Sequence, residues 1–216
     1  MERIQILIFE GFDDLDVFAP FEILAAAGFT TELVTLSQTW SVRSAHGASV
    51  HPHSVLASDP DLLVVPGGGW ASRAPRGAWA EVQSGRLPPR IAERHGNGAV
   101  VAGICSGVML LAATGLLRGR PAVTHRVALD ELRESGADVR PEARVVDDGD
   151  LLTAGGVTSA IDLALHIVER ERGQEAALTG ARRIEYERRG PVLETAPSAT
   201  TRVTGQAPGA LSGGRG

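Results

Sequence analysis

The sequence predicts a doubly wound α/β sandwich with a mainly parallel central sheet and a cysteine at a sharp turn between a strand and a helix. Three observations carry this prediction. Strand-like and helix-like segments alternate along the chain, as they do in βαβ units. Several strand-like runs are apolar throughout, which is typical of strands buried on both faces. Glycines also flank the lone cysteine at the end of one such run, in the pattern Gly103-x-Cys105-x-Gly107.

The N-terminal part of the chain predicts two strands with a helix between them. Arg3–Phe9 is a mostly apolar run, as a buried parallel strand is. Asp13 and Asp14 offer carboxylates that can cap the following helix, which we expect to run to the residue before Gly28. Thr30–Leu36 then predicts the second strand.

The next part predicts a hairpin, a third central strand and a helix. Val42–Arg43 and Ser49–His53 are typical of a short hairpin. Asp61–Val65 predicts another buried strand, and it ends in the glycine-rich run Pro66-Gly67-Gly68-Gly69. Leu87–His95 has the pattern of a helix.

The cysteine lies at the start of the second half. Ala99–Ile104 predicts a strand, and the helix that follows it is expected over Ser106–Leu116. Val127–Ser135 predicts a further helix.

The C-terminal part predicts a hairpin and two helices. Arg144–Val146 and Leu151–Ala154 flank an Asp-Asp-Gly-Asp run, which is typical of a tight turn between two strands. Val157–Glu171 predicts a nearly all-apolar, well-buried helix, and Gln174–Glu187 predicts the last one.

Length and composition indicate one globular domain. The chain has 216 residues, of which 43% are hydrophobic and 22% charged. We expect the domain to span residues 1–188 and residues 189–216, which are rich in Gly, Pro, Ser and Thr, to be a disordered tail. A net charge of −5 argues against nucleic-acid or acidic-membrane partners. No run reaches the length of a membrane helix and no signal peptide opens the chain, so we expect a cytoplasmic protein.

Cys105 is the most informative residue. Glycines two positions before and after a nucleophile permit a sharp turn that lifts its side chain above the sheet. The N-terminus of the next helix then faces the sulfur, and its dipole is expected to favour the reactive thiolate. The alternative is a buried structural cysteine. The glycine pattern at a strand end favours the nucleophile.

The glycine-rich run after the third central strand predicts an oxyanion hole. Glycines at the carboxyl end of a sheet let backbone N–H groups approach a ligand closely. We expect the amides of Gly68 and Ser106 to supply this site. The alternative is a loop that needs glycine only for its backbone conformation.

Two further side chains are candidates for acid–base chemistry. Asp16, inside an apolar helix start, could act as an acid or base beside the thiol, although a surface aspartate stabilised by the helix N-terminus is the alternative. His125 could pair with the thiolate or bind substrate, or it could be structural. His51 and His53 share one strand face but lack an evident third ligand, so we expect no metal site.

These segments together resemble the DJ-1/PfpI superfamily, over roughly residues 3–186. The similarity rests on four runs of sequence: Val64–Gly68, Ala102–Arg120, Val123–His125 and Leu152–Ala164. The resemblance implies a flavodoxin-like three-layer sandwich, a homodimer, a small-molecule substrate and no cofactor.

Three activities compete within this superfamily. Its amidotransferases carry a late His-x-Glu pair, whereas here His166 is followed by Ile167-Val168-Glu169, so glutamine hydrolysis is not expected. Its glyoxalase- and peptidase-like members place a Glu in the first helix, where this chain has Asp16. An aspartate at that position is similar to isonitrile hydratases. Its regulators carry a DNA-binding half of about 100 residues, for which this chain has no room after residue 186.

The resemblance to isonitrile hydratases implies an enzyme that adds water to an isonitrile and releases an N-substituted formamide through a Cys105 thioimidate. Cys105, Asp16 and Ser106 carry over as catalytic residues, with Ser106 in place of the usual Thr. We expect His125, Gly67 and Phe18 to contact the substrate. Three alternatives stay open: a glyoxalase-type enzyme, a biosynthetic lyase or hydratase, and a redox or ligand sensor that is not an enzyme.

Overall fold

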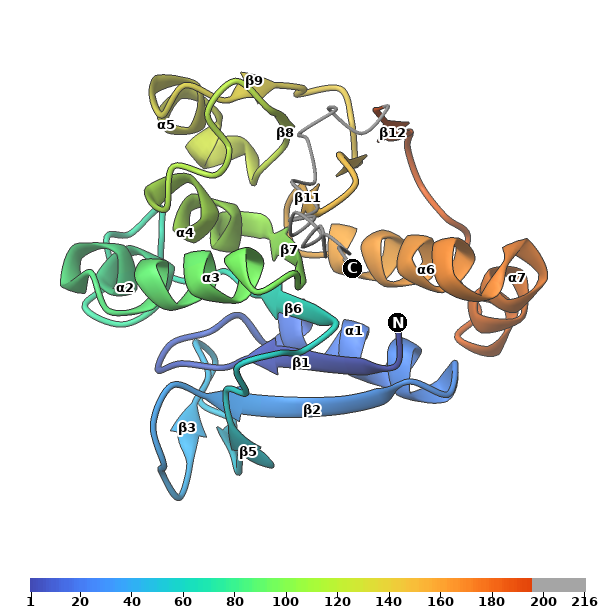
Figure 1. The fold of residues 1–216 in the computed structure, drawn as a ribbon, viewed down its shortest axis with the longest axis horizontal. Helices are drawn as coiled ribbons and strands as arrows, with labels where there is room; N and C mark the ends of the chain where they lie inside the picture. The colour runs from blue at the N-terminus through green and yellow to red at the C-terminus, as the bar shows by residue number, and fades with distance from the viewer. Residues whose placement is uncertain (196–216) are drawn as a thin grey trace, which may run out of the picture.

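A computed structural model of the chain describes residues 1–195, and its core is an eight-stranded sheet (Figure 1). The strands lie in the order β12-β10-β11-β7-β6-β1-β2-β5. Five of them form a parallel centre: β1 (Arg3–Leu7), β2 (Thr30–Thr35), β6 (Leu62–Val65), β7 (Val100–Ile104) and β11 (Leu151–Ala154). In this sheet only β10 (Val145–Asp147) and β11 pair antiparallel. The predicted mainly parallel sheet is confirmed.

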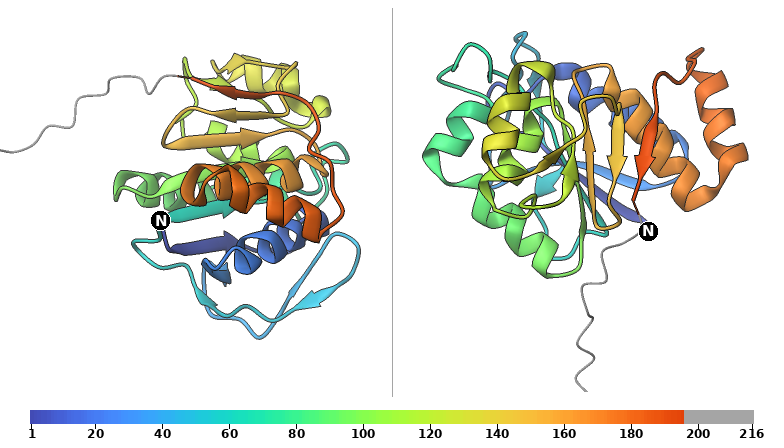
Figure 2. Two further views of the ribbon diagram at one scale, coloured as in Figure 1. Left: turned by 90° about the vertical axis from the view of Figure 1, so that its right-hand side faces the viewer. Right: turned by 90° about the horizontal axis from the view of Figure 1, so that it is seen from above.

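Helices cover both faces of this sheet, as Figure 2 shows. On one face, α1 (Asp14–Ala26) packs against α6 (Ser159–Arg172), which also packs against α7 (Gln174–Arg183). On the other, α2 (Ala78–Ser84), α3 (Leu87–Gly96) and α4 (Val108–Ala113) contact one another. The four central strands from β1 to β11 are almost wholly buried. Burial on both faces explains why their sequences are apolar without alternation.

Besides one edge strand, short strands form two separate two-stranded sheets, one near each end of the main sheet. The predicted hairpin forms as β3 (Val42–Arg43) and β4 (Ser49–Val50), and β5 (Ser54–Val55) adds an edge strand beside β2. Near the other end, β8 (Pro121–Ala122) pairs parallel with β9 (Asp138–Val139), and α5 (Leu129–Glu134) lies between these two strands in the chain. No helix in residues 1–195 is long and apolar enough to cross a membrane.

The structure corrects three expectations about elements. The helix expected from Ser106 begins as a 3-10 turn over Cys105–Gly107, and α4 follows it. The helix expected over Val127–Ser135 is divided into a 3-10 turn (Arg126–Ala128) and α5. The segment expected as a tail begins with a strand, β12 (Val192–Glu194), which pairs parallel with β10. The rest of that expected tail, residues 196–216, lies outside the described residues.

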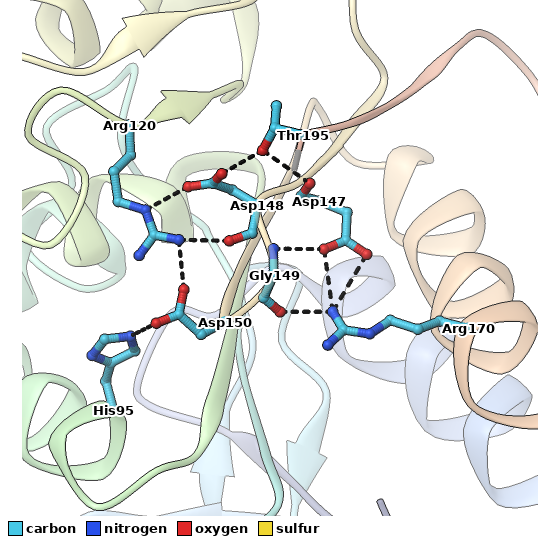
Figure 3. Close-up of polar contacts among 8 residues, drawn as sticks. All are labelled: His95, Arg120, Asp147, Asp148, Gly149, Asp150, Arg170 and Thr195. Atoms are coloured by element: carbon cyan, nitrogen blue, oxygen red, sulfur yellow. Dashed lines mark hydrogen bonds and ion pairs between the residues drawn. The ribbon is translucent and has the colours of Figure 1, made fainter. Parts of the chain in front are cut away.

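The turn between β10 and β11, together with the last residue of β10, contributes four of the residues drawn in Figure 3. Arg120 binds the carboxylates of Asp148 and Asp150, and Arg170 binds that of Asp147. Thr195 donates its hydroxyl hydrogen to Asp148 and its N–H to the carbonyl of Asp147. These contacts tie the end of β12 to the turn, which explains why this polar segment is ordered.

Candidate active site

Cys105 lies where β7 ends, at the turn predicted from the glycine pattern. Its φ is 53°, in the left-handed region that side chains other than glycine rarely adopt. Two hydrogen bonds hold its backbone there: its N–H donates to the carbonyl of Gly155 at 3.0 Å, and its carbonyl accepts from Thr124 Oγ1 at 2.7 Å. The side chain is buried, with the residue only 7% exposed. Strained backbone of this kind is typical of functional sites, which fits the prediction that Cys105 is the nucleophile.

The two flanking glycines are needed because other groups come very close, and not because of their own backbone angles. A Cβ on Gly107 would lie 2.2 Å from the carbonyl oxygen of Val65. A Cβ on Gly103 would lie 3.0 Å from Cα of Val108. Each glycine therefore lets the turn pack against the neighbouring strand or helix, while Cys105 itself carries the positive φ.

Asp16 projects from the first turn of α1 into the protein, where it is 0% exposed. Its Oδ2 accepts the N–H of Gly67 at 2.9 Å, while Oδ1 has no hydrogen-bond partner among the described residues. Burial raises the pKa of this carboxyl well above its ordinary value, and the charge of Asp13 raises it further. The Gly67 hydrogen bond and the Cys105 side chain oppose this rise only in part. Asp16 is thus a buried carboxyl whose raised pKa favours the protonated form, and the alternative of a surface aspartate is wrong.

The thiol of Cys105 is neutral in this arrangement. Burial raises its pKa to about 12, and the neighbouring Asp16 adds to the rise. The amides of Val157 and Ser106 favour the thiolate, but they do not outweigh burial. Burial therefore outweighs the help that was expected from the start of the next helix. The α-helix begins only at Val108, after a 3-10 turn, and burial dominates.

The glycine-rich run after β6 contacts both Asp16 and the turn that carries Cys105. The N–H of Gly67 is held by Asp16, and the N–H of Gly68 donates to Ser106 Oγ at 3.0 Å. A Cβ on Gly67 would lie 2.6 Å from the same oxygen, so only glycine fits between the loop and the turn. Both amides are engaged within the protein. The expected oxyanion role of Gly68 therefore requires the Ser106 hydroxyl to move aside.

The structure gives His125 and Phe18 different surroundings. The ring of His125 lies against Gly156, whose Cβ would come within 2.4 Å of it, so it borders the loop behind Cys105. Burial lowers its pKa, as does the charge of Arg126, and its Nδ1 accepts the N–H of Val127. Phe18 is 38% exposed and packs edge-on against Phe12. No described hydrogen bond joins His125 to the thiol, and both substrate contacts remain predictions.

Sequence reasoning assigned no chemistry to the loop Gly155–Val157 or to Thr124. The loop supplies the carbonyl that binds the Cys105 N–H and, at Val157, an amide that favours the thiolate. Val157 has a φ of 32°, an outlier for a β-branched residue. The sequence signal that could have identified this loop was the pair Gly155 and Gly156, which lies between a strand and a helix. Among residues 1–195, no group of three or more His, Cys, Asp or Glu side chains could hold a metal.

Known proteins share this fold and part of this sequence. Residues 2–170 match the DJ-1/PfpI family. An isonitrile hydratase of Pseudomonas putida is 30% identical over 203 residues, which cover 91% of this chain and 86% of the relative. A Parkinson disease protein 7 homolog of Danio rerio is 25% identical, over 82% of this chain and 93% of the relative. The crystal structure of a ThiJ/PfpI family protein from Pseudomonas syringae has a TM-score of 0.75 and 26% identity, over 88% of this chain and 78% of that one.

Proposed function

The chain belongs to the DJ-1/PfpI family, and on this premise we propose that it is a cysteine-dependent hydratase that converts an isonitrile and water to an N-substituted formamide. The Pseudomonas putida relative supports this proposal through its own activity, because it covers most of the chain. The observation that carries the proposal is a buried carboxyl beside a buried thiol, with the pKa of both groups raised. Asp16 Oδ1 has no hydrogen-bond partner in residues 1–195, and that oxygen can hold the proton that passes to the substrate carbon.

Hydration of an isonitrile needs both the Asp16 carboxyl and the Cys105 thiol to reach the same atom, the terminal carbon. Its terminal carbon carries a lone pair that accepts a proton, and once protonated the carbon is attacked by a nucleophile. Asp16 delivers its proton to this carbon, while the sulfur of Cys105 forms the new C–S bond and the thiol proton passes to Asp16. The product of this step is a thioimidate, R–N=CH–S–Cys105. Its atoms are those of the isonitrile and the thiol, and Asp16 ends the step as it began, protonated.

Water completes the reaction. It adds to the thioimidate carbon as the nitrogen gains a proton, and the tetrahedral intermediate R–NH–CH(OH)–S–Cys105 results. Collapse forms the C=O bond, breaks the C–S bond and returns a proton to the sulfur, which leaves R–NH–CHO. The amides of Ser106 and Val157, which favour the thiolate, stabilise sulfur as it leaves.

The Ser106 hydroxyl has a suitable place for orienting the attacking water. It accepts the N–H of Gly68 and donates to no acceptor among the described residues. Its own hydrogen is therefore available to a water molecule above the turn. This role needs only the hydroxyl, so the loss of a methyl group relative to Thr does not remove it.

The buried neutral thiol argues against a redox sensor. Peroxide reacts with thiolates, and sensor cysteines have low pKa values and ready access to solvent. Cys105 has a raised pKa and is buried. A glyoxalase-type enzyme would use the same two side chains on a reactive carbonyl, and the experiment below separates it from a hydratase.

The proposal is tested by incubating the purified protein with a simple alkyl isonitrile and following the formamide by mass spectrometry. We expect product from the wild type and none above background from Cys105→Ala, because no other cysteine can replace the nucleophile. Methylglyoxal and peroxide are offered in parallel. Turnover of methylglyoxal without formamide, or equal formamide from both proteins, would contradict the proposal.

A further inference from the structure

A cavity of about 310 Å³ lies beside the loop Gly155–Val157, which supports Cys105. Its walls come from that loop, from the residues after β8 and from the segments on either side of β10. They include Thr124, Arg126, Glu142, Arg144, Gly155 and Ser159. Neither Cys105 nor Asp16 lines it. We propose that this cavity binds inorganic phosphate, which is a function separate from the hydratase chemistry and independent of it.

Ser159 supplies the observation that points to a ligand. It is the first residue of α6, a helix of 14 residues, and it is only 1% exposed. Its hydroxyl has no hydrogen-bond partner in residues 1–195, although it lines the cavity. The oxygen is not sealed from solvent and reaches the cavity, so a bound group that accepts its hydrogen would take the place of water there.

Two arginines provide positive charge at the same cavity. Arg126 is exposed and forms no ion pair within residues 1–195, so its whole guanidinium group is available. Arg144 binds Asp162 and the hydroxyl of Thr158, which fixes it beside the start of α6. The positive end of the α6 dipole points the same way. Glu142 is the one acidic side chain among the lining residues, and it lies exposed at the rim, where water screens it.

The cavity floor favours phosphate over other oxyanions. A Cβ on Gly155 would point at Ser159 Oγ, 3.2 Å away, and would also lie 3.9 Å from the carbonyl oxygen of Thr124. That carbonyl accepts no backbone hydrogen bond from the described residues. Inorganic phosphate at neutral pH carries both a hydroxyl that can donate to the carbonyl and oxygens that can accept from Ser159 and Arg126. Sulfate has no such hydroxyl.

Binding of inorganic phosphate to the full chain tests this site without any turnover. Calorimetric titration and the shift of the unfolding temperature are recorded with phosphate, with sulfate and with sodium chloride at equal ionic strength. We expect saturable binding of phosphate, weaker binding of sulfate and none of chloride. Identical responses to all three salts would overturn the site, and equal affinity for sulfate would overturn its assignment to phosphate.

Variants locate the binding. Arg126→Gln and Ser159→Ala should each weaken phosphate binding, by about tenfold for the arginine, since a charge-assisted hydrogen bond is lost. Arg133→Gln is the matched control, because it removes an exposed charge nearby on α5 that is already paired with Asp130. Phosphate affinity that is unchanged in both cavity variants would refute the site. Formamide production plays no part in these measurements, so failure of the hydratase proposal leaves them valid.

Discussion

At the scale of single residues, the candidate site depends on a pair of groups that cannot both ionise easily. Asp16 and Cys105 are both buried, burial raises the pKa of each, and the charge of Asp16 raises the pKa of Cys105 further. We propose that the pair enters the reaction carrying two protons and no net charge. An uncharged pair is suited to an uncharged substrate that must gain a proton, and an isonitrile is such a substrate.

Thr124 is expected to position the nucleophile. Its hydroxyl binds the carbonyl of Cys105 at 2.7 Å and helps to hold the strained φ of 53°. Thr124→Val keeps the shape of the side chain but removes this bond, so the sulfur should shift and kcat should fall by about 10- to 100-fold. The rate of alkylation of Cys105 by iodoacetamide reports the same shift without any substrate.

A conservative variant separates positioning from packing at Thr124. Thr124→Ser retains the hydroxyl and should restore most of kcat and the wild-type rate of alkylation. Wild-type kcat and alkylation in Thr124→Val would show that the hydrogen bond to Cys105 does not position the sulfur.

At the scale of elements, the turn after β7 is held by backbone packing that tolerates no side chain at Gly107. Gly107→Ala would place a Cβ 2.2 Å from the carbonyl of Val65, so β6 or the turn must move. We expect a loss of about 1–3 kcal/mol in the free energy of unfolding, measured by urea denaturation.

Gly96→Ala is the control for that measurement. Gly96 is the last residue of α3, and a Cβ there would meet nothing within 4 Å. This variant should be neutral or more stable by up to about 1 kcal/mol, because alanine favours the helix. A Gly107→Ala protein as stable as the wild type would show that the close approach does not constrain the turn.

The elements that the sequence predicted correctly are those with strong local signals. Apolar runs identified the central strands, and the glycines around Cys105 identified the turn that carries it. The strand Val192–Glu194 was missed because its order comes from pairing with β10 and from the contacts of Thr195, which are remote in sequence. The burial of Asp16 was left open for the same reason, since Gly67 and Cys105 approach it only in the folded chain.

At the scale of the whole molecule, we propose a homodimer, as the family resemblance implies. An apolar cavity of about 270 Å³ lies between α1, α6 and α7 and offers a surface on which a second copy could pack. Light scattering after size-exclusion chromatography should give a mass twice the 22.6 kDa of one chain. A mass of one chain at all concentrations would contradict this assembly.

The proposed hydration chemistry depends on Asp16 as the proton donor, and the pH dependence of kcat/KM for isonitrile hydration tests this role most directly. The raised pKa of Asp16 means that the carboxyl is protonated at low pH and loses its proton as the pH rises through that pKa. Wild-type activity should therefore be level at acidic pH and fall on the alkaline side. Asp16→Asn should be slower by about 10²- to 10⁴-fold and should lack the alkaline fall due to Asp16.

Asp14→Asn is the matched control in this measurement, because Asp14 lies two residues earlier on the same helix and binds His46 at the surface. It should keep the wild-type rate and profile. The account predicts that only the Asp16 variant loses both activity and the alkaline limb. An Asp16→Asn protein with wild-type kcat/KM and an unchanged pH profile would contradict it.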